Sequence, residues 1–268
     1  GGLSTRSLGI AEFRDPFIEY VIAAFCLLSS INFINYRELL ARRWRNFFRD
    51  PELRAFVGTI AACTAFIGAS LWLSGGYASA HDSFKQAFLQ VSALVSTSGY
   101  VTADFSLWPS ACQWLILILI MVGGCSSSTA GGLKIIRVQI MLRLMLRNVY
   151  KRLHPRAVVA VKLGGKAVSA ETASNVSAFL LTYFAIFVLG TFVLAAMDGK
   201  DMLTSLSAAA AALSNNSVGF GQIGHLGTFG VFSAPARVFL ALLMIVGRLE
   251  IFTVLILFTP AYWRMGRG

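Results

Sequence analysis

Charged residues are scarce in this sequence. Only 13% of its 268 residues are Asp, Glu, Lys or Arg, whereas soluble domains carry about 25%. With 56% apolar residues and a mean hydropathy of +0.70, the composition excludes an ordinary soluble protein. The aromatic share of 12% and the long apolar runs also exclude a disordered chain. We therefore expect a lipid bilayer to be the solvent of this chain.

Cysteine is also rare, and its spacing excludes two classes of site. The four cysteines are far apart in the sequence and form no CxxC pair: Cys26, Cys63, Cys112 and Cys125. Three of them lie inside apolar stretches. The sequence therefore predicts buried thiols rather than a disulfide framework or a zinc site.

Acidic residues number 12 against 23 basic ones, and the basic residues are clustered. Six lie in 37–54, nine in 134–166 and two at the C-terminal end, between or after apolar stretches. The positive-inside rule explains this distribution and predicts that 37–54, 134–170 and 263–268 are cytoplasmic. No nucleic-acid partner is expected, because the basic residues are not interleaved with aromatic residues on one folded face.

Apolar segments of two lengths alternate along the chain. A spanning helix needs about 20 apolar residues, and segments of this length lie near 17–36, 55–73, 172–197 and 236–262. Two shorter segments, 83–95 and 202–214, are predicted to be re-entrant half-helices. A glycine-bearing polar run follows each of them, at 96–100 and at 215–221.

These segments define a repeat of helix, half-helix, glycine loop and helix. It occurs at 55–133 and at 172–262, and residues 2–5 with 17–36 match the end of a third copy. The expected fold is an all-α polytopic membrane protein. The chain opens on Gly1-Gly2 without an initiator methionine, so we expect it to be part of something longer.

The glycine loops are the strongest candidates for function. Non-helical backbone at membrane depth is tolerated where it lines a pore or a site. Glycine allows successive carbonyls to point inward and replace the hydration shell of an alkali cation, and the C-terminus of a half-helix favours a cation nearby. Flexible external loops are the alternative interpretation.

The second long segment of the middle unit is interrupted. Residues 114–122 are apolar, but a run rich in Gly and Ser follows from Gly123 to Gly132, as in the broken helices of transporters. Beyond it, polar residues at 139, 143 and 147 predict an interfacial or cytoplasmic helix. The run lacks the spacing of a phosphate-binding loop, and its serines have no His or Asp partner, so no enzyme is predicted.

Arg248 lies in the middle of the segment 236–262. An ionisable residue at the centre of a bilayer is costly unless it faces a cavity or a partner, which favours a functional role. A structural pair between Arg248 and Glu250 is the alternative, although residues two apart do not share a helix face.

Several motifs occur in order along the chain: 96–108, 123–137, 154–156, 161–165 and 247–252. With them the chain resembles the TrkH branch of the Trk/Ktr/HKT potassium-translocating subunits. The resemblance implies a pseudo-fourfold pore of four repeats in one polypeptide of the bacterial plasma membrane, with K⁺ as the transported ion. It also implies a homodimer on a cytosolic nucleotide-binding, TrkA-like regulatory subunit.

On this resemblance, the chain divides into four parts. Residues 1–53 would be the tail of the second repeat, with an outer-to-inner helix at 17–36 and a basic loop. Residues 54–150 would be the third repeat, 151–170 a cytoplasmic linker, and 171–268 the fourth repeat.

The resemblance also implies roles for individual residues. The filter would contain Gly1, Gly2, Thr97, Ser98, Gly99, Ser217, Val218 and Gly219. The gate would contain Gly123, Gly124, Ser126, Ser127, Ser128, Thr129, Gly131, Gly132, Lys134 and, facing the pore beside them, Arg248. The fourth filter departs from the expected Gly-Pro-Gly-like run, so its register stays open.

Two functions are consistent with these residues. A gated, channel-like potassium pore is favoured, because Glu19 and Glu250 are the only acids that we place within the spans. A symporter that couples potassium to a proton or a sodium ion is the alternative.

Overall fold

The structure, a computed structural model, describes residues 9–13, 15–157, 159–224 and 227–265. The predictions for Gly1 and Gly2 therefore lie outside the described residues. Within these ranges the chain is helical, apart from a short antiparallel pair of strands, β1 (Lys162–Leu163) and β2 (Lys166–Ala167). Four short 3-10 helices occur in the connections: η1 (Gly9–Phe13), η2 (Phe105–Leu107), η3 (Gly221–Ile223) and η4 (Phe229–Val231).

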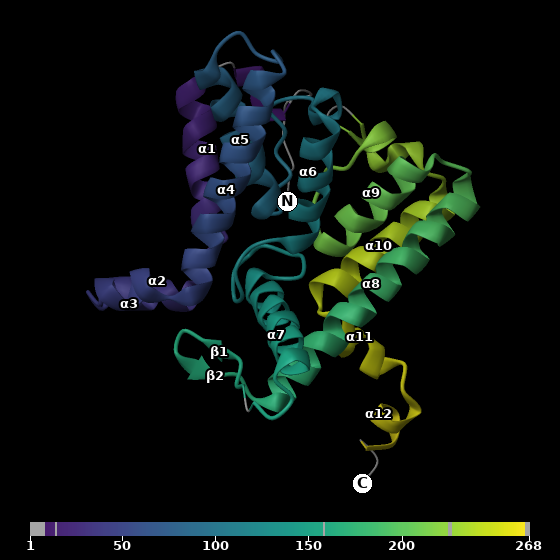
Figure 1. The fold of residues 1–268 in the computed structure, drawn as a ribbon. Helices are drawn as coiled ribbons and strands as arrows, with labels where there is room; N and C mark the ends of the chain where they lie inside the picture. Colours follow the sequence, from purple (N-terminus) through teal and green to yellow (C-terminus); the bar gives the residue numbers. More distant parts are fainter. Residues whose placement is uncertain (1–8, 14, 158, 225–226, 266–268) are drawn as a thin grey trace.

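One group of helices is formed by α1 (Pro16–Ser29), α4 (Pro51–Leu73) and α5 (Ala80–Val95). These three helices lie side by side (Figure 1). Apolar residues of α4 and α5, among them Ile67, Leu71 and Leu94, are fully or almost fully buried between them. This packing holds α5 against both α1 and α4.

A second group is formed by α8 (Ala170–Asp198), α9 (Met202–Ser214) and α10 (Ala234–Arg248). In this group a short helix, α9, packs against two longer ones. The helix α6 (Ser110–Val122) lies between the groups and contacts both α5 and α9 (Figure 1). The order of helix, half-helix and returning helix expected from the sequence therefore corresponds to α4, α5 and α6, and again to α8, α9 and α10.

The sequence predicted one continuous helix over 17–36, but the structure has two helices there. The helix α1 ends at Ser29, and α2 (Phe33–Leu40) leaves it at an angle of 96°. The hydroxyls of Ser29 and Ser30 each donate to the carbonyl of Cys26 at 2.8 Å, which competes with the helical hydrogen bonds. The carbonyls freed at the bend accept hydrogen bonds from another segment, described below.

The segment 236–262 is likewise broken. The helix α10 ends at Arg248, and α11 (Ile251–Leu257) follows at 112°. Glu250 between them has a φ of +61°, which is incompatible with a continuous α-helix. Beyond α11 lies the short helix α12 (Pro260–Met265).

Two of the described helices, α4 and α8, are individually long and apolar enough to cross a membrane. The bent pairs α1–α2 and α10–α11 pass the same test of length and composition when each is taken as one unit, which brings the number of possible spans to four. The two short apolar helices α6 and α9 have 13 residues each and do not reach this length.

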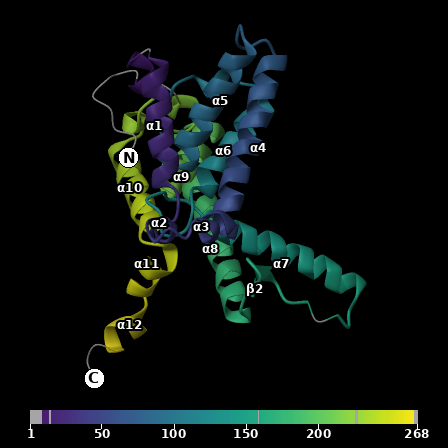
Figure 2. The same ribbon diagram turned by 90° about the vertical axis from the view of Figure 1, so that its left-hand side faces the viewer.

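The basic segments gather at one end of the molecule. There lie α2, α3 (Trp44–Arg49), α7 (Ile135–Leu153) and the β1–β2 hairpin, with α7 projecting sideways from the helix groups (Figures 1 and 2). Gln139 and Arg143 of α7 donate to the backbone carbonyls of Pro51 and Lys162, while Leu142 and Leu146 are exposed. The helix predicted beyond the break is therefore present, and its buried residues are Ile135, Ile140 and Leu144.

The four cysteines are buried and free, as predicted from their apolar surroundings.

Candidate functional site

The helices α5 and α9, which correspond to the two predicted half-helices, end inside the protein in the same way. In α9, most side chains from Thr204 to Ser214 are fully buried. Thr97 and Asn215, which follow the ends of α5 and α9, have left-handed φ angles of +53° and +55°. The amides of Ser98 and Asn216 then donate to carbonyls five residues earlier, those of Ala93 and Ala211. The repeat seen in the sequence is therefore also a repeat of local structure.

The two glycine loops contact each other directly. The hydroxyl of Ser217 donates to the carbonyls of Gly99 at 3.1 Å and Ser98 at 3.4 Å. Gly99 has a φ of +67°, and a Cβ atom there would lie 1.9 Å from Oγ of Ser217. Both the backbone angle and the close approach therefore require glycine at position 99.

Ser217, rather than Gly219, is the counterpart of Gly99 when residues are counted from the shared cap. Gly99 and Ser217 each stand six residues after the accepting alanine, Ala93 or Ala211. Gly219 lacks the positive φ of Gly99. Its filter role stays a prediction.

Two helix C-termini thus converge on one point. The last carbonyls of an α-helix carry a partial negative charge, and the loops that follow α5 and α9 add the carbonyls of Ser98 and Gly99 next to Ser217. Asn216 joins the two ends further, because its side-chain amide donates to the carbonyl of Leu94 at 3.2 Å. This arrangement is electrostatically suited to a desolvated cation.

The interrupted segment between α6 and α7 forms a loop below these glycine loops. It is anchored to the bend between α1 and α2, where Cys125 donates through its amide to the carbonyl of Ser30 at 3.0 Å. Thr129 donates to the carbonyl of Ser29, through its amide at 3.3 Å and its hydroxyl at 3.0 Å. The loop thus supplies the donors for the carbonyls that the broken helix leaves free.

Glycine is required where the loop packs closely. A Cβ atom at Gly131 would lie 2.1 Å from the carbonyl oxygen of Ser214, at the end of α9. At Gly123, which has a φ of +70°, a Cβ atom would lie 2.1 Å from the carbonyl oxygen of Gly131. The loop therefore folds back on itself and packs against the end of α9.

Arg248 reaches the same loop. Its guanidinium donates to the carbonyl of Thr129 at 2.8 Å. Arg248 is the last residue of α10 at the bend, rather than the middle of a continuous helix as predicted.

The alternative of a pair between Arg248 and Glu250 is wrong. Glu250 instead pairs with Arg137 of α7 at 2.5 Å, and the guanidinium of Arg137 lies 3.9 Å from the ring centre of Phe179.

A cavity of about 390 Å³ opens beside the loop. Its lining brings together the charged side chains of Lys134, Arg137, Arg248 and Glu250 with the loop backbone at Gly131. Lys134 also donates to the carbonyl of Ala130. Three basic groups and one acid give this cavity a net positive charge, which opposes the passage of a cation.

One filter candidate, Thr97, and one gate candidate, Gly131, are in direct contact. Gly131 contacts both the end of α9 and, through its amide, the hydroxyl of Thr97 at 2.9 Å. Among the described residues, no three His, Cys, Asp or Glu side chains gather in a group that could hold a metal ion. Backbone carbonyls are the ligands that this site offers.

Sequence reasoning missed Glu52 in the first turn of α4. Its side chain is buried, with 3% of the residue exposed. The carboxylate accepts hydrogen bonds from the amide and hydroxyl of Ser126, at 2.5 and 2.7 Å, and from the side-chain amide of Asn32 at 3.3 Å. The only signal in the sequence was an acid within a basic segment, which did not point to Ser126.

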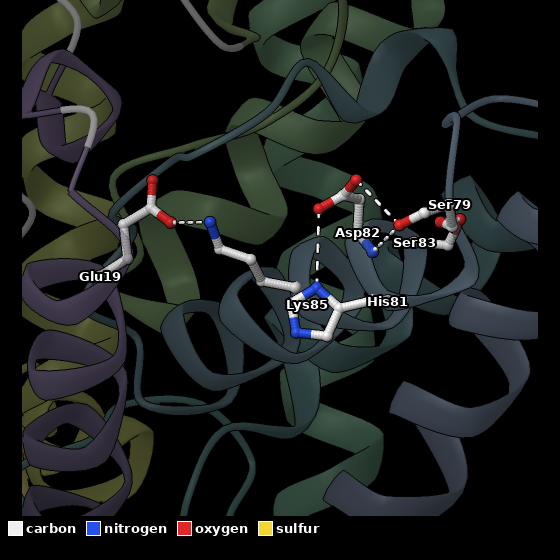
Figure 3. Close-up of polar contacts among 6 residues, drawn as sticks. All are labelled: Glu19, Ser79, His81, Asp82, Ser83 and Lys85. Atoms are coloured by element: carbon white, nitrogen blue, oxygen red, sulfur yellow. Dashed lines mark hydrogen bonds and ion pairs between the residues drawn. The ribbon is translucent and has the colours of Figure 1, made fainter.

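Sequence reasoning also missed the ion pair between Glu19 of α1 and Lys85 of α5. Figure 3 shows the two side chains pointing at each other, and the ammonium lies 2.6 Å from the carboxylate. Their side chains are only 9% and 13% exposed. On the far side of Lys85, the first turn of α5 is capped by Ser79, which accepts from the amide of Asp82. The pair fixes α1 against α5.

Comparisons with known proteins identify the family of this chain. The model of the TrkH family, described as a cation transport protein, matches residues 1–265. The Trk system potassium uptake protein TrkH of Halomonas elongata is 37% identical, with 98% of this chain and 54% of that protein covered. The TrkH protein of Escherichia coli K12 is 34% identical with the same coverage.

A solved structure gives the same result. The crystal structure of the potassium transporter TrkH from Vibrio parahaemolyticus superposes with a TM-score of 0.91 at 34% identity, covering 98% of this chain and 56% of that one. The chain therefore spans about half the length of the relatives it matches.

Proposed function

Because this chain belongs to the TrkH family of cation transport proteins, we propose that it forms part of a gated pore for potassium uptake. The observation that carries the proposal is the meeting of two glycine loops at the buried ends of α5 and α9, with an interrupted helix anchored below them. The family is one of transport proteins, which agrees with the expectation that the chain is not an enzyme.

In this proposal the filter is lined by Thr97, Ser98 and Gly99 from one loop and by Ser217, Val218 and Gly219 from the other. Their carbonyls replace the water around K⁺, the transported ion, and no organic cofactor takes part. Residues 1–53, 54–150 and 171–268 contribute to three repeats around a pseudo-fourfold axis, and 151–170 links two of them.

The gate is the loop of residues 123–132, together with Lys134 and Arg248. The loop lies beneath the filter candidates, and the positive charge of Arg248 beside it raises the barrier to a cation. Displacement of the loop would widen the path. The glycines of the loop make such movement possible because glycine lacks a Cβ atom and imposes few steric limits on the backbone.

The whole protein is proposed to lie in the bacterial inner membrane as a homodimer with a cytosolic nucleotide-binding regulatory subunit. The basic elements α2, α3 and α7 gather at one end, as the positive-inside rule expects of a cytoplasmic face. That end would be where the regulatory subunit acts. The names of the relatives place them in a Trk system, which supports partner subunits in general terms.

Potassium flux in liposomes that contain the full-length protein tests this proposal. We expect potassium to move down its gradient. When sodium replaces potassium, we expect the total cation flux to fall. Absence of potassium flux from folded, membrane-inserted protein would contradict the pore.

A coupled symporter is the second candidate, because Glu52 of α4 is a buried carboxylate that is hydrogen-bonded to the gate loop. A proton-sensitive dye inside the same liposomes separates the two functions. Proton movement in fixed proportion to potassium would favour the symporter, and its absence the pore.

A further inference from the structure

Glu52 joins the loop of residues 123–132 to the start of α4. Its two carboxylate oxygens accept from the amide and hydroxyl of Ser126 and from the side chain of Asn32. All three partners are donors, as an ionised carboxylate requires. These contacts also bring together segments distant in the sequence, since 74 residues separate Glu52 from Ser126.

The same helix start is connected to the basic end of the molecule. Asp50, which caps α4, accepts from the side chain of Asn35 in α2 at 3.2 Å. The carbonyl of Pro51 accepts from Gln139 in α7 at 3.1 Å. Two elements of the basic end, α2 and α7, therefore contact the backbone turn that carries Glu52.

The position of Glu52 in its helix does not explain its burial. Glu171 occupies the corresponding second position of α8, where an acid interacts favourably with the N-terminal end of the helix dipole. Glu171 is nevertheless exposed, whereas Glu52 is buried against the loop. Helix stabilisation accounts for an acid at either position, and the contact with Ser126 is what distinguishes Glu52.

We propose that Glu52 is the latch that holds the loop closed, and that movement of the α4 start relative to the loop releases it. This inference rests on the gate role proposed above. While the loop is in place, both oxygens of the buried carboxylate accept hydrogen bonds. When the loop leaves, the carboxylate loses both donors of Ser126, so the closed arrangement is favoured. A regulator that shifts α2 or α7 would act on the loop through this residue.

The test uses the full-length protein in lipid nanodiscs, with Glu52→Gln as the main variant and Glu171→Gln as its matched control. Glutamine keeps the shape of the side chain but removes the charge and presents an NH₂ group to neighbouring donors. Hydrogen exchange of the loop amides reports loop release directly. The informative amides are those of Thr129 and Gly131, because neither donates to Glu52.

We expect Glu52→Gln to speed exchange at these two amides by about tenfold or more, since tenfold is the lower end of what the loss of a hydrogen bond to a charged group produces. Exchange in α8 and α9 should stay unchanged, as should all exchange in Glu171→Gln. Resting potassium flux should rise in Glu52→Gln alone. Unchanged loop exchange in folded Glu52→Gln protein, or equal acceleration throughout the molecule, would overturn the latch.

Two further outcomes separate the latch from the gate. Faster loop exchange without a rise in flux would support the latch and contradict the gate role of the loop. If Glu52→Gln does not fold, Ser126→Ala serves in its place, because it removes one hydroxyl donor and leaves the carboxylate. Unchanged loop exchange in Ser126→Ala would then overturn the latch.

Discussion

The amide of Gly131 donates a 2.9 Å hydrogen bond to the side-chain hydroxyl of Thr97. Thr97 belongs to the glycine loop after α5, and Gly131 belongs to the interrupted segment between α6 and α7. The filter candidate and the gate candidate are therefore in direct contact. A change of conformation in either segment has a short route to the other.

Replacing Gly99 should weaken the discrimination of potassium from sodium. Alanine at a φ of +67° costs about 1 kcal/mol or more, and its Cβ atom would overlap with Ser217. The carbonyls of this loop would have to shift. The ratio of potassium to sodium flux through the full-length protein measures the effect.

Gly165→Ala provides the control for Gly99→Ala. Gly165 has a φ of +83°, so alanine is strained there too, but nothing lies within 4 Å of the added atom. The ratio of potassium to sodium flux through the Gly165→Ala protein should equal that of the unmodified protein. An equal ratio in both variants would argue against a filter role for Gly99.

Arg248→Ala should raise potassium flux and make it less dependent on the regulatory subunit. The substitution removes a positive charge beside the loop and the hydrogen bond to Thr129. Arg237→Ala, at an exposed position of the same helix, should leave flux unchanged. A loss of flux in well-folded Arg248→Ala protein would instead indicate a purely structural arginine.

Removing one partner of the pair Glu19–Lys85 should destabilise the protein more than removing both. Either Glu19→Gln or Lys85→Met leaves one ionisable group buried without its partner, at a cost of about 3 kcal/mol. The double variant leaves no unpaired charge and should recover most of this loss. Thermal unfolding of the four proteins in detergent forms the required cycle, and additive losses would show that the pair is not coupled.

Asp201 should make the stability of α9 sensitive to acid. Hydrogen bonds from the hydroxyl and the amide of Thr204 lower the pKa of this capping carboxylate. Since its folded pKa lies below the unfolded value, the stabilisation is present at neutral pH and is lost as the pH falls through the folded pKa.

Asp201→Asn tests this pH dependence, because asparagine also caps helices. Its melting temperature at pH 7 should be close to that of the unmodified protein, and its decrease in acid should be smaller. An identical decrease in both proteins would exclude Asp201 as a source of the acid sensitivity.

The short helices could be predicted from the sequence, but the bends could not. The helix α9 agrees with the predicted segment 202–214 because a capping Asp201 and a glycine-bearing run bound an apolar stretch. Between Ser30 and Phe33 the chain has neither proline nor glycine, and the apolar pattern continues. The bend there depends on donors from residues 125 and 129, which are distant in the sequence.

The same limit applies to the site. Gly99 was identified because a glycine-bearing polar run follows a short apolar segment, and Arg248 because an ionisable residue is unusual within an apolar one. The contact of Glu52 with Ser126 was not, because an acid at the start of a helix is common and gives no hint of a distant partner.

The bend after α1 implies that the loop of residues 123–132 cannot move unless water enters the region it leaves. The carbonyls of Ser29 and Ser30 accept from Thr129 and Cys125, so departure of the loop exposes acceptors that need new donors. Water is the donor that can follow the loop into this region, and hydration of the bend would accompany opening. Osmolytes that withdraw water should therefore favour the closed protein, in proportion to the number of water molecules that enter.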